Sequence, residues 1–530
     1  MIKWSPFWTD EVKIENGGRY PLLLNRFHDH MEDYLIKGIV STTDRLRYIS
    51  YCCWAIGDIE YTMNCDKYYE FEEAFRIRES ALAVGTYLLK PKTLVGNYSI
   101  YGTQVMKYMV DYEEKEYNCS FKLLPSQPLG AFGQYYKGTV QNWGLIYVDE
   151  KGIIRLTEFG KELYEIMVEN YSNFEYYLFY KGKQVVPGKV LKNWAKANEY
   201  DNITDVYHKA ERDFYKNVLF HLEDKKVVDK RRDSLTIYLE CIMECNKREI
   251  SFDETVLRNI LYYKRIQSKN GIIQIELSSC LDETAFYWMM YETQVYFRWW
   301  ISEYFCFFLK RLSGSANGLM LDEVVSDVSM EIFNNKTEEI LKMGIDYYSL
   351  TFNELESCVN KVNFPDKWFL EDVLSDIAIE NISHLYANLL MIMALLHYKY
   401  KEINEDDRYS MVRMRLIDDY WFEEFFRDID SIKDYTVPDL LKFLLDRYAI
   451  QKHDKAMYAK NDLRRCWFTK SGERYQFQAD SRSIWRPAKH KIICNFLFDM
   501  KLVTIKEGDT VIASEGKVLY KQLKEKIYYE

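Results

Sequence analysis

The amino-acid sequence predicts a mainly α-helical protein with several domains. At 530 residues the chain is long enough for two to four domains, each with an apolar core of its own. Only 9 residues are proline and 22 are glycine, so few positions break a helix. Hydrophobic residues make up 48% of the chain and aromatic residues 16%, which excludes a disordered protein. Two short strand–turn–strand–helix patterns interrupt the helical character.

The first of these patterns runs from Trp143 to Glu165. Two apolar stretches flank Asp-Glu-Lys-Gly at 149–152, where Gly152 can supply the positive φ of a tight hairpin turn. Thr157 then offers an N-cap for a helix over 158–171. The segment therefore predicts a hairpin closed by a helix.

The second pattern repeats the first near the other end of the sequence, over 501–520. When Gly160 is aligned with Gly516, both copies read Gly-Lys-x-Leu-Tyr, and the second turn is one residue shorter. Each copy, over roughly 45 residues with the helix before it, resembles the wing and closing helix of winged helix-turn-helix modules. The resemblance implies that a helix over 487–500 is the recognition helix, and that its first residues contact DNA.

The helix expected before the first wing, over 129–142, carries a single cation, Lys137. Several phosphate contacts need several cations, so we expect this module to face protein and not nucleic acid. Its apolar residues are spaced for one buried face, expected to pack on the N-terminal helices or on a partner subunit. These residues are Phe132, Tyr135, Tyr136 and Val140.

Four regions follow from these features. We expect an N-terminal helical region ending in a winged-helix-like module (1–181), a helical region (189–312), an acidic helical region (313–450) and a basic C-terminal winged-helix-like module (451–530). Gly182 to Gly188, with Pro187, reads as the linker between the first two. The apolar stretch from Ala285 to Leu309 contains Glu292, Arg298 and Glu303, so it predicts a buried helix and not a membrane span.

Charge is distributed unevenly in a chain whose net charge is −10. Between Arg447 and Lys491 there are 12 Lys or Arg and 4 Asp or Glu, whereas Asp322 to Glu380 holds 4 Lys and 14 acids. Cations interleaved with aromatic side chains are typical of nucleic-acid surfaces. The alternative is that this basic face pairs with the acidic middle of the chain. The predicted nucleic-acid-binding residues are Arg464, Arg465, Lys470, Arg474, Arg482, Arg486, Lys489, His490 and Lys491.

No motif specifies a cofactor, a metal or a catalytic residue, and we expect none. Gly182 to Lys189 has five residues between its glycines where a P-loop has four. His28 and Asp29 are similar to the central pair of HD-type phosphohydrolases, but no second ligand cluster accompanies them, so we expect a polar helix surface. Cys241 and Cys245 lack a second ligand pair for zinc, which favours buried thiols.

A metal-dependent nuclease is the enzymatic alternative. Its Glu-x-Lys element occurs at Glu113, Glu223 and Glu515, a number that chance explains in a chain that is 29% charged. Glu515 falls at a predicted helix start, where a carboxylate favours the helix dipole.

Eleven cysteines without framework spacing, and no apolar leader at Met1, predict a cytoplasmic protein with reduced thiols. We interpret the chain as a non-catalytic nucleic-acid-associated binding or scaffold subunit of a larger bacterial complex, anti-phage or chromosome-organising. Winged modules near both ends of a helical chain resemble the layout of kleisin subunits. Expected partners are DNA or RNA and other proteins or a second copy, without a membrane. A protein-binding hub without nucleic acid is the third alternative.

Overall fold

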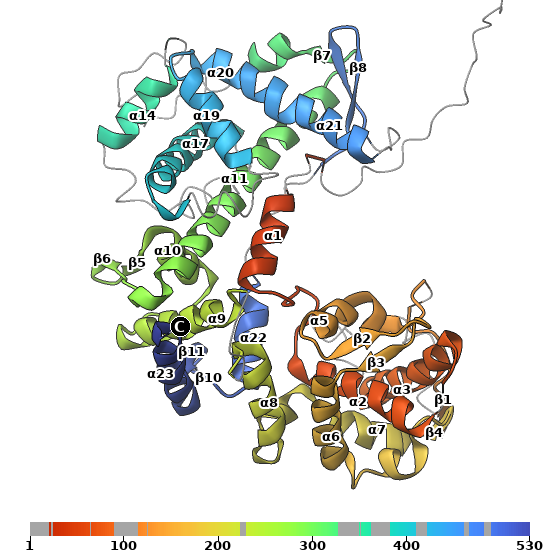
Figure 1. Ribbon diagram of the computed structural model, residues 1–530. Helices are drawn as coiled ribbons and strands as arrows, with labels where there is room; N and C mark the ends of the chain where they lie inside the picture. Colours follow the sequence, from red (N-terminus) through yellow and green to blue (C-terminus); the bar gives the residue numbers. More distant parts are fainter. Residues whose placement is uncertain are drawn as a thin grey trace, which may run out of the picture. The chain divides into compact units, whose positions relative to one another are not determined.

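The computed structural model describes residues 21–22, 25–63, 65–89, 115–124, 126–222, 229–326, 349, 351–361, 382–409, 421–460, 466–481 and 489–529. These residues are mainly α-helical and carry only small antiparallel sheets, which confirms the predicted fold class (Figure 1). The chain divides into two compact units. Unit 1 comprises residues 1–32, 258–266 and 286–487, and unit 2 comprises residues 33–257, 267–285 and 488–530.

The first hairpin module of unit 2 contains the segment predicted from the sequence. Strands β2 and β3 pair antiparallel, with Ile146 opposite Leu156, and α6 begins directly afterwards with Thr157 as its N-cap. The elements of this part are α2 (Leu46–Thr62), α3 (Tyr68–Leu89), η2 (Phe132–Tyr136), α5 (Lys137–Asn142), β2 (Ile146–Val148), β3 (Ile154–Leu156) and α6 (Glu158–Tyr171).

The second hairpin module of unit 2 is assembled from distant parts of the sequence. Its hairpin pairs Val503 with Ile512, and α9 packs against both β11 and α23. Its elements are α9 (Arg231–Lys247), α22 (His490–Asp499), β10 (Val503–Lys506), β11 (Asp509–Ile512) and α23 (Ser514–Tyr529). Most of unit 1 lies, in sequence, between α9 and α22.

The two hairpin modules follow the same backbone path. The second residue after the end of each helix before the hairpin has a positive φ, Gly144 (+72°) in one module and Lys501 (+59°) in the other. The next residue is a leucine in both modules, and its carbonyl oxygen accepts from the backbone N–H that follows the hairpin. The N–O distances are 3.0 Å for Leu145 and 2.9 Å for Leu502. The predicted correspondence of the two segments, including the shorter second turn, is confirmed at the level of strand pairing.

A helix side chain covers the outer strand of each hairpin at the matching position. Glu60 of α2 accepts from the backbone N–H of Leu156 at 3.1 Å. Asn246 of α9 accepts from the backbone N–H of Ile512 at 2.9 Å and donates to the carbonyl of Thr510 at 3.0 Å. Because an open strand edge invites pairing with other chains, these contacts keep both hairpins two-stranded.

The rest of unit 2 joins the two modules. Residues 182–188, expected to be a linker, instead form β4 and the start of α7, and β4 pairs with β1 (Glu116–Asn118). Both flanks of this segment belong to unit 2. The connecting elements are η3 (Tyr176–Tyr180), β4 (Val185–Pro187), α7 (Gly188–Ala197), η4 (Tyr200–Thr204), η5 (Val206–His208), α8 (Lys209–Phe220) and η6 (Ser279–Leu281).

Unit 1 is built around the long aromatic helix α11 (Asp282–Ser313), which is buried along most of its length, as predicted. A three-stranded sheet of order β7–β9–β8 also belongs to it. Its other elements are β7 (Leu319–Met320), α14 (Phe352–Lys361), α17 (Ile382–Asn404), α19 (Trp421–Ser431), α20 (Val437–Leu444), η8 (Leu445–Ile450), α21 (Gln451–Lys460), β8 (Phe468–Ser471) and β9 (Arg474–Phe477). Elements α1 (Asn25–Leu35), α10 (Glu254–Tyr263) and β5 (Arg265–Ser268) each contain a point in the sequence at which the chain passes from one unit to the other, and β6 (Gly271–Gln274) belongs to unit 2.

A buried histidine ties three helices of unit 1 together. The His397 ring lies between two carboxylates, with Nδ1 3.0 Å from Glu356 and Nε2 3.0 Å from Asp430. Burial alone would raise the pKa of Glu356, but His397 and Lys401 donate to it and lower its pKa to about 2. The three groups belong to α14, α17 and α19, so this network is structural.

Candidate nucleic-acid interface

The structure does not bring the predicted basic residues into one body. Arg464, Arg465, Arg482 and Arg486 lie outside the described residues. Lys470 and Arg474 belong to the β8–β9 hairpin of unit 1, whereas Lys489, His490 and Lys491 belong to unit 2.

Arg474 pairs with the acidic region of its own chain, which is the alternative to nucleic-acid binding. Its Nη1 and Nη2 each lie 3.2 Å from a Glu323 carboxylate oxygen, and Nη1 also donates to the Gly318 carbonyl at 2.9 Å. Lys470 is exposed, with Nζ 5.2 Å from the Tyr475 ring centroid. The basic hairpin therefore leaves Lys470 exposed and places Arg474 against the acidic region.

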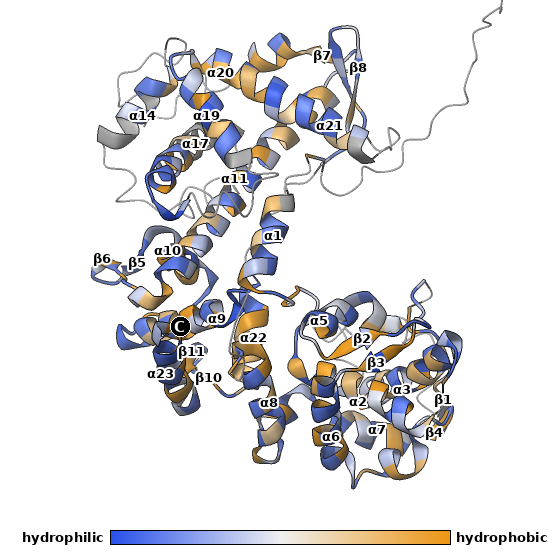
Figure 2. Cartoon of the chain, viewed as in Figure 1, coloured by the Kyte–Doolittle hydropathy of each residue, from blue (hydrophilic) through white to orange (hydrophobic). Residues whose placement is uncertain are grey.

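Helix α22, the predicted recognition helix, uses its C-terminal half to hold unit 2 together. Asp499 is fully buried and accepts from Arg45 Nη2 at 2.6 Å and from the backbone N–H of Leu46 at 3.0 Å, at the start of α2. Burial raises the pKa of Asp499 to about 6, although Arg45 lowers it. Phe496 packs edge-on against Trp143, with ring centroids 5.8 Å apart. The helix is largely apolar (Figure 2).

The first residues of α22 present one exposed cation. The His490 ring lies 5.3 Å from the Phe252 ring and 5.8 Å from the Tyr238 ring, between centroids. Lys489 is half-buried and Lys491 is exposed. Since most of this helix faces its own chain, little of it is left to read base edges in a major groove.

Helix α23 carries a row of cations that are not among the predicted nucleic-acid-binding residues. Lys517, Lys521 and Lys524 are exposed and spaced four and three residues apart, so they lie on one helix face. Within the described part of the chain, none of the three side chains forms an ion pair or hydrogen bond. Tyr528, 70% exposed, continues the same face. We call these four residues the α23 row.

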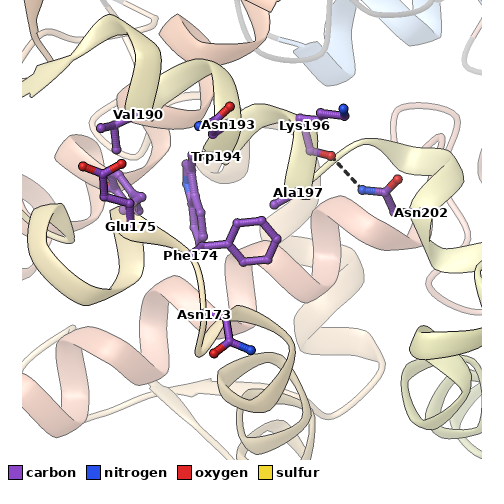
Figure 3. A pocket seen from close by; sticks show the side chains of 10 residues that line it. Asn173, Phe174, Glu175, Val190, Asn193, Trp194, Lys196, Ala197 and Asn202 are labelled. Carbon is purple, nitrogen blue, oxygen red and sulfur yellow. Dashed lines mark hydrogen bonds between the residues drawn. The ribbon is translucent and has the colours of Figure 1, made fainter.

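Helix α7 carries a second row, next to a pocket. Lys189, Lys192 and Lys196 are exposed, again with spacings of three and four, and α7 contains no Asp or Glu. We call these three residues the α7 row. A pocket of about 460 Å³ lies beside it, as Figure 3 shows. It is lined by Asn173, Phe174, Glu175, Tyr176, Val190, Asn193, Trp194, Lys196, Ala197 and Asn202.

The apolar face predicted before the first wing is buried, as expected. Phe132, Tyr136 and Val140 are fully buried, whereas Tyr135 is 37% exposed. Phe132 packs on Phe75 of α3, and Tyr136 on Tyr48 of α2, with ring centroids 5.0 and 4.4 Å apart. A π-helical turn over η2 moves Tyr135 off this face, because π-helix geometry shifts side-chain positions relative to an α-helix. This face packs on the N-terminal helices.

The cluster of possible metal ligands at His28 differs from the expected polar surface. Asp29 is exposed, but the His28 side chain is buried, so the expectation was wrong for this residue. Tyr291 explains the burial: its hydroxyl lies 2.9 Å from His28 Nε2 and donates to Glu32 at 3.0 Å. His28, Asp29 and Glu32 offer ligand atoms within 4.8 Å of one another. Tyr291 already occupies one nitrogen of the histidine and one oxygen of the glutamate.

The other candidates for chemistry have structural roles or lie outside the described residues. Cys241 and Cys245 are buried free thiols, as predicted. Glu515 lies in the first turn of α23 and accepts from Lys216 Nζ at 2.7 Å, which fits its expected place at a helix start. The tripeptides beginning at Glu113 and Glu223 are not within the described ranges.

A buried ion pair joins Glu211 to Arg47. Burial raises the pKa of Glu211, but the Arg47 charge lowers it, and the pKa lies below the ordinary value.

No protein-family model, curated protein or solved structure matches the chain. Among the helices that the structure describes, none combines the length and apolar character needed to cross a bilayer.

Proposed function

We propose that the protein is a non-catalytic nucleic-acid-binding scaffold whose second hairpin module contacts phosphates through the α23 row. The observation that supports this most directly is the row itself. A chain with a net charge of −10 keeps Lys517, Lys521 and Lys524 on one helix face without an acidic partner among the described residues. Phosphate backbones favour such a row, because each contact releases counterions.

The contact surface proposed here differs from that of most winged-helix modules. In this chain α22 packs inside unit 2: Asp499 accepts a hydrogen bond from the start of α2, and Phe496 packs on Trp143 at the end of α5. The closing helix α23 instead presents free cations beside the β10–β11 hairpin. This arrangement favours backbone contact with little sequence preference, since phosphates carry no sequence information.

The scaffold part of the proposal rests on the arrangement of unit 2. Two hairpin modules of matching backbone path stand in one compact unit, and the first uses its apolar helix face for its own core. The first module is accordingly proposed as structural and the second as the contact with nucleic acid.

The test compares the full-length protein with the variant Lys517→Gln/Lys521→Gln/Lys524→Gln. Binding to a fluorescein-labelled 20-base-pair DNA duplex is followed by fluorescence anisotropy from 50 to 300 mM salt. Each lost phosphate contact lowers the log–log salt slope by about 0.9, so the slope should fall by roughly 2 to 3. The charge-matched control is Lys151→Gln/Lys209→Gln/Lys247→Gln, which removes three dispersed lysines of unit 2 and should leave the slope within about 0.5 of the parent.

Three results would count against the proposal. The parent protein failing to bind the duplex even at 50 mM salt would favour the protein-binding hub. Equal loss in the two triple variants would show that only net charge matters. Cleavage of the duplex on addition of Mg²⁺ would instead support the nuclease alternative.

A further inference from the structure

We propose that the pocket beside α7 accepts an unpaired nucleotide, so that the protein binds single-stranded nucleic acid at a site separate from the α23 row. The inference rests on the proposed function, because it adds a second contact for the same class of ligand. Three features of the pocket support it: a row of cations beside it, an aromatic wall and two exposed amides without a hydrogen bond to the described part of the chain.

The cations lie where a phosphate backbone would pass. Lys196 lines the pocket, and Lys189 and Lys192 continue the same face of α7. Seven residues of α-helix rise about 10 Å, so the row extends well beyond one phosphate group. Among the described residues none of these three side chains forms an ion pair or hydrogen bond, so their charges are available to a ligand.

The aromatic wall of the pocket consists of two buried rings, Trp194 and Tyr176, and one partly exposed ring, Phe174. The Trp194 ring is fully buried and stacks on Tyr176, with centroids 4.5 Å apart at an interplanar angle of 24°. Phe174 is half-buried, its ring 6.3 Å from that of Trp194 at 73°. Figure 3 shows the Phe174 ring lying beside Trp194, between Asn193 and Asn173. A half-exposed ring held by buried aromatics offers a face on which a planar base can stack.

The polar lining matches the edges of bases. Asn173 and Asn193 are exposed side-chain amides without a hydrogen bond within the described part of the chain. Each offers donors and an acceptor, the combination that pairs with adenine and other base edges. Glu175 also lines the pocket and can accept from a base amino group. Asn202 donates to the Lys196 carbonyl at 2.7 Å and so supports the wall.

The pocket selects unpaired nucleotides because a base inside a duplex has its edges and faces occupied. Such a base must leave the stack before an amide or an aromatic ring can reach it. The pocket volume of about 460 Å³ lies within the usual range for small-molecule sites, roughly 300–1,000 Å³. A single base with its sugar is therefore the ligand that fits both the size and the chemistry.

The experiment measures anisotropy of a fluorescein-labelled 12-nucleotide single strand and of a 20-base-pair duplex on the full-length protein. Phe174→Ala should weaken single-strand binding about 5- to 100-fold, because stacking on one aromatic ring contributes that much. Duplex binding should stay within about twofold. Lys189→Gln/Lys192→Gln/Lys196→Gln should lower the single-strand salt slope by about 2.

Matched variants separate a ligand contact from a folding defect. Phe179, 63% exposed and five residues away, does not line the pocket, so Phe179→Ala should bind both probes like the parent. Phe174→Tyr keeps an aromatic face and should restore single-strand binding. Equal binding by the Phe174→Ala and Phe179→Ala variants would overturn the inference, as would equal loss of both probes in Phe174→Ala.

The outcomes also separate this inference from the proposed function. Duplex binding that depends on the α23 row, combined with single-strand binding indifferent to Phe174, would leave the proposed function standing and refute the pocket. Absence of binding to either probe at 50 mM salt would refute both. A polyglutamate peptide that displaces the single strand at equal charge concentration would assign the pocket to an acidic protein partner and would likewise overturn the inference.

Discussion

The Glu79 carboxyl group lies in the interior of unit 2, where its neighbours determine its ionisation. Tyr48 Oη and the backbone N–H of Phe132 both donate to its Oε1, at 2.6 and 2.9 Å. Burial raises the pKa of Glu79 to about 7, and these donors only partly offset that effect. Gly130 approaches the other oxygen so closely that a Cβ there would lie 1.9 Å from Oε2.

This environment predicts a specific dependence of stability on pH. The folded pKa is raised above the ordinary value of 4.5, so the contribution of Glu79 is fully present below that value and is lost as pH rises through about 7. The loss amounts to about 3 kcal/mol. We expect Glu79→Gln to remove this dependence between pH 6 and 8, above the pKa of about 6 of buried Asp499 in the same unit, measured by urea unfolding followed by circular dichroism. Glu73→Gln, on an exposed position of the same helix, is the control. A parent-like pH profile in Glu79→Gln would contradict the assignment.

Residue types alone do not show that the side chains of Glu79 and His28 are buried. Glu79 follows Arg76 and Arg78 and reads in sequence like one position of a solvated helix face. Its burial depends on Tyr48 and on the backbone near residue 132, which are distant in the sequence. His28 was misread for the same reason, because Tyr291 reaches it from a helix more than 250 residues away.

At the scale of elements, one glycine in each hairpin module allows the closing helix to approach the leucine before the hairpin. A Cβ at Gly160 would lie 2.0 Å from the Leu145 carbonyl oxygen, and one at Gly516 would lie 2.1 Å from that of Leu502. Backbone atoms cannot move aside as flexible side chains can. The shared Gly-Lys-x-Leu-Tyr sequence therefore reports a shared packing constraint.

Substitution of these glycines should be costly in both modules. We expect Gly160→Ala and Gly516→Ala each to lower the free energy of unfolding by about 1–3 kcal/mol, because the new methyl group overpacks the site. Gly138 of α5 is the matched control: its position is exposed and a Cβ there meets no atom within 4 Å. Gly138→Ala should raise stability by up to about 1 kcal/mol, as expected for alanine in a helix. Chemical denaturation of the three variants gives the comparison, and a neutral Gly160→Ala would refute the constraint.

The sequence predicted some elements well because their signals are local. The bounds of α6 agree with those expected, since Thr157 caps the helix, and the hairpin turns follow from their glycines. The α7 and α23 rows were missed for a physical reason. Counting charges over a segment mixes all faces of a helix, and α23 also contains Glu515 and Glu525. The spacings of three and four residues place these lysines on one helix face, but only the structure shows that this face is exposed to solvent.

At the scale of the whole molecule, the connectivity of the two units is their main feature. The chain passes between them at residues 32–33, 257–258, 266–267, 285–286 and 487–488. The core of unit 2 is therefore complete only when α22 has been added, because α22 places Phe496 against Trp143 and Asp499 at the start of α2. No reading of local patterns predicts such closure, because it depends on contacts between residues hundreds of positions apart.

This connectivity predicts cooperative unfolding within each unit. Phe496→Ala should destabilise unit 2 by roughly 3–5 kcal/mol, since it removes a fully buried ring. Hydrogen–deuterium exchange read by mass spectrometry should then accelerate in α2, α8 and α9, with α20 and α21 of unit 1 unchanged. Phe425→Ala, which removes a buried ring of α19, should give the reverse pattern. Acceleration across both units in either variant would show that they unfold as one.

The late position of α22 also bears on how the protein is made. More than 450 residues separate Asp33, where unit 2 begins, from Ala488, where its last segment starts. At about 5–20 residues per second, a ribosome needs on the order of 20–90 s to cover that distance. During this time α2 lacks the Asp499 carboxylate at its N-terminus, and Trp143 lacks its partner ring. Most of unit 2 is thus translated before most of unit 1, yet unit 2 is finished last. Its nascent apolar surface is a natural substrate for chaperones until translation has passed residue 500.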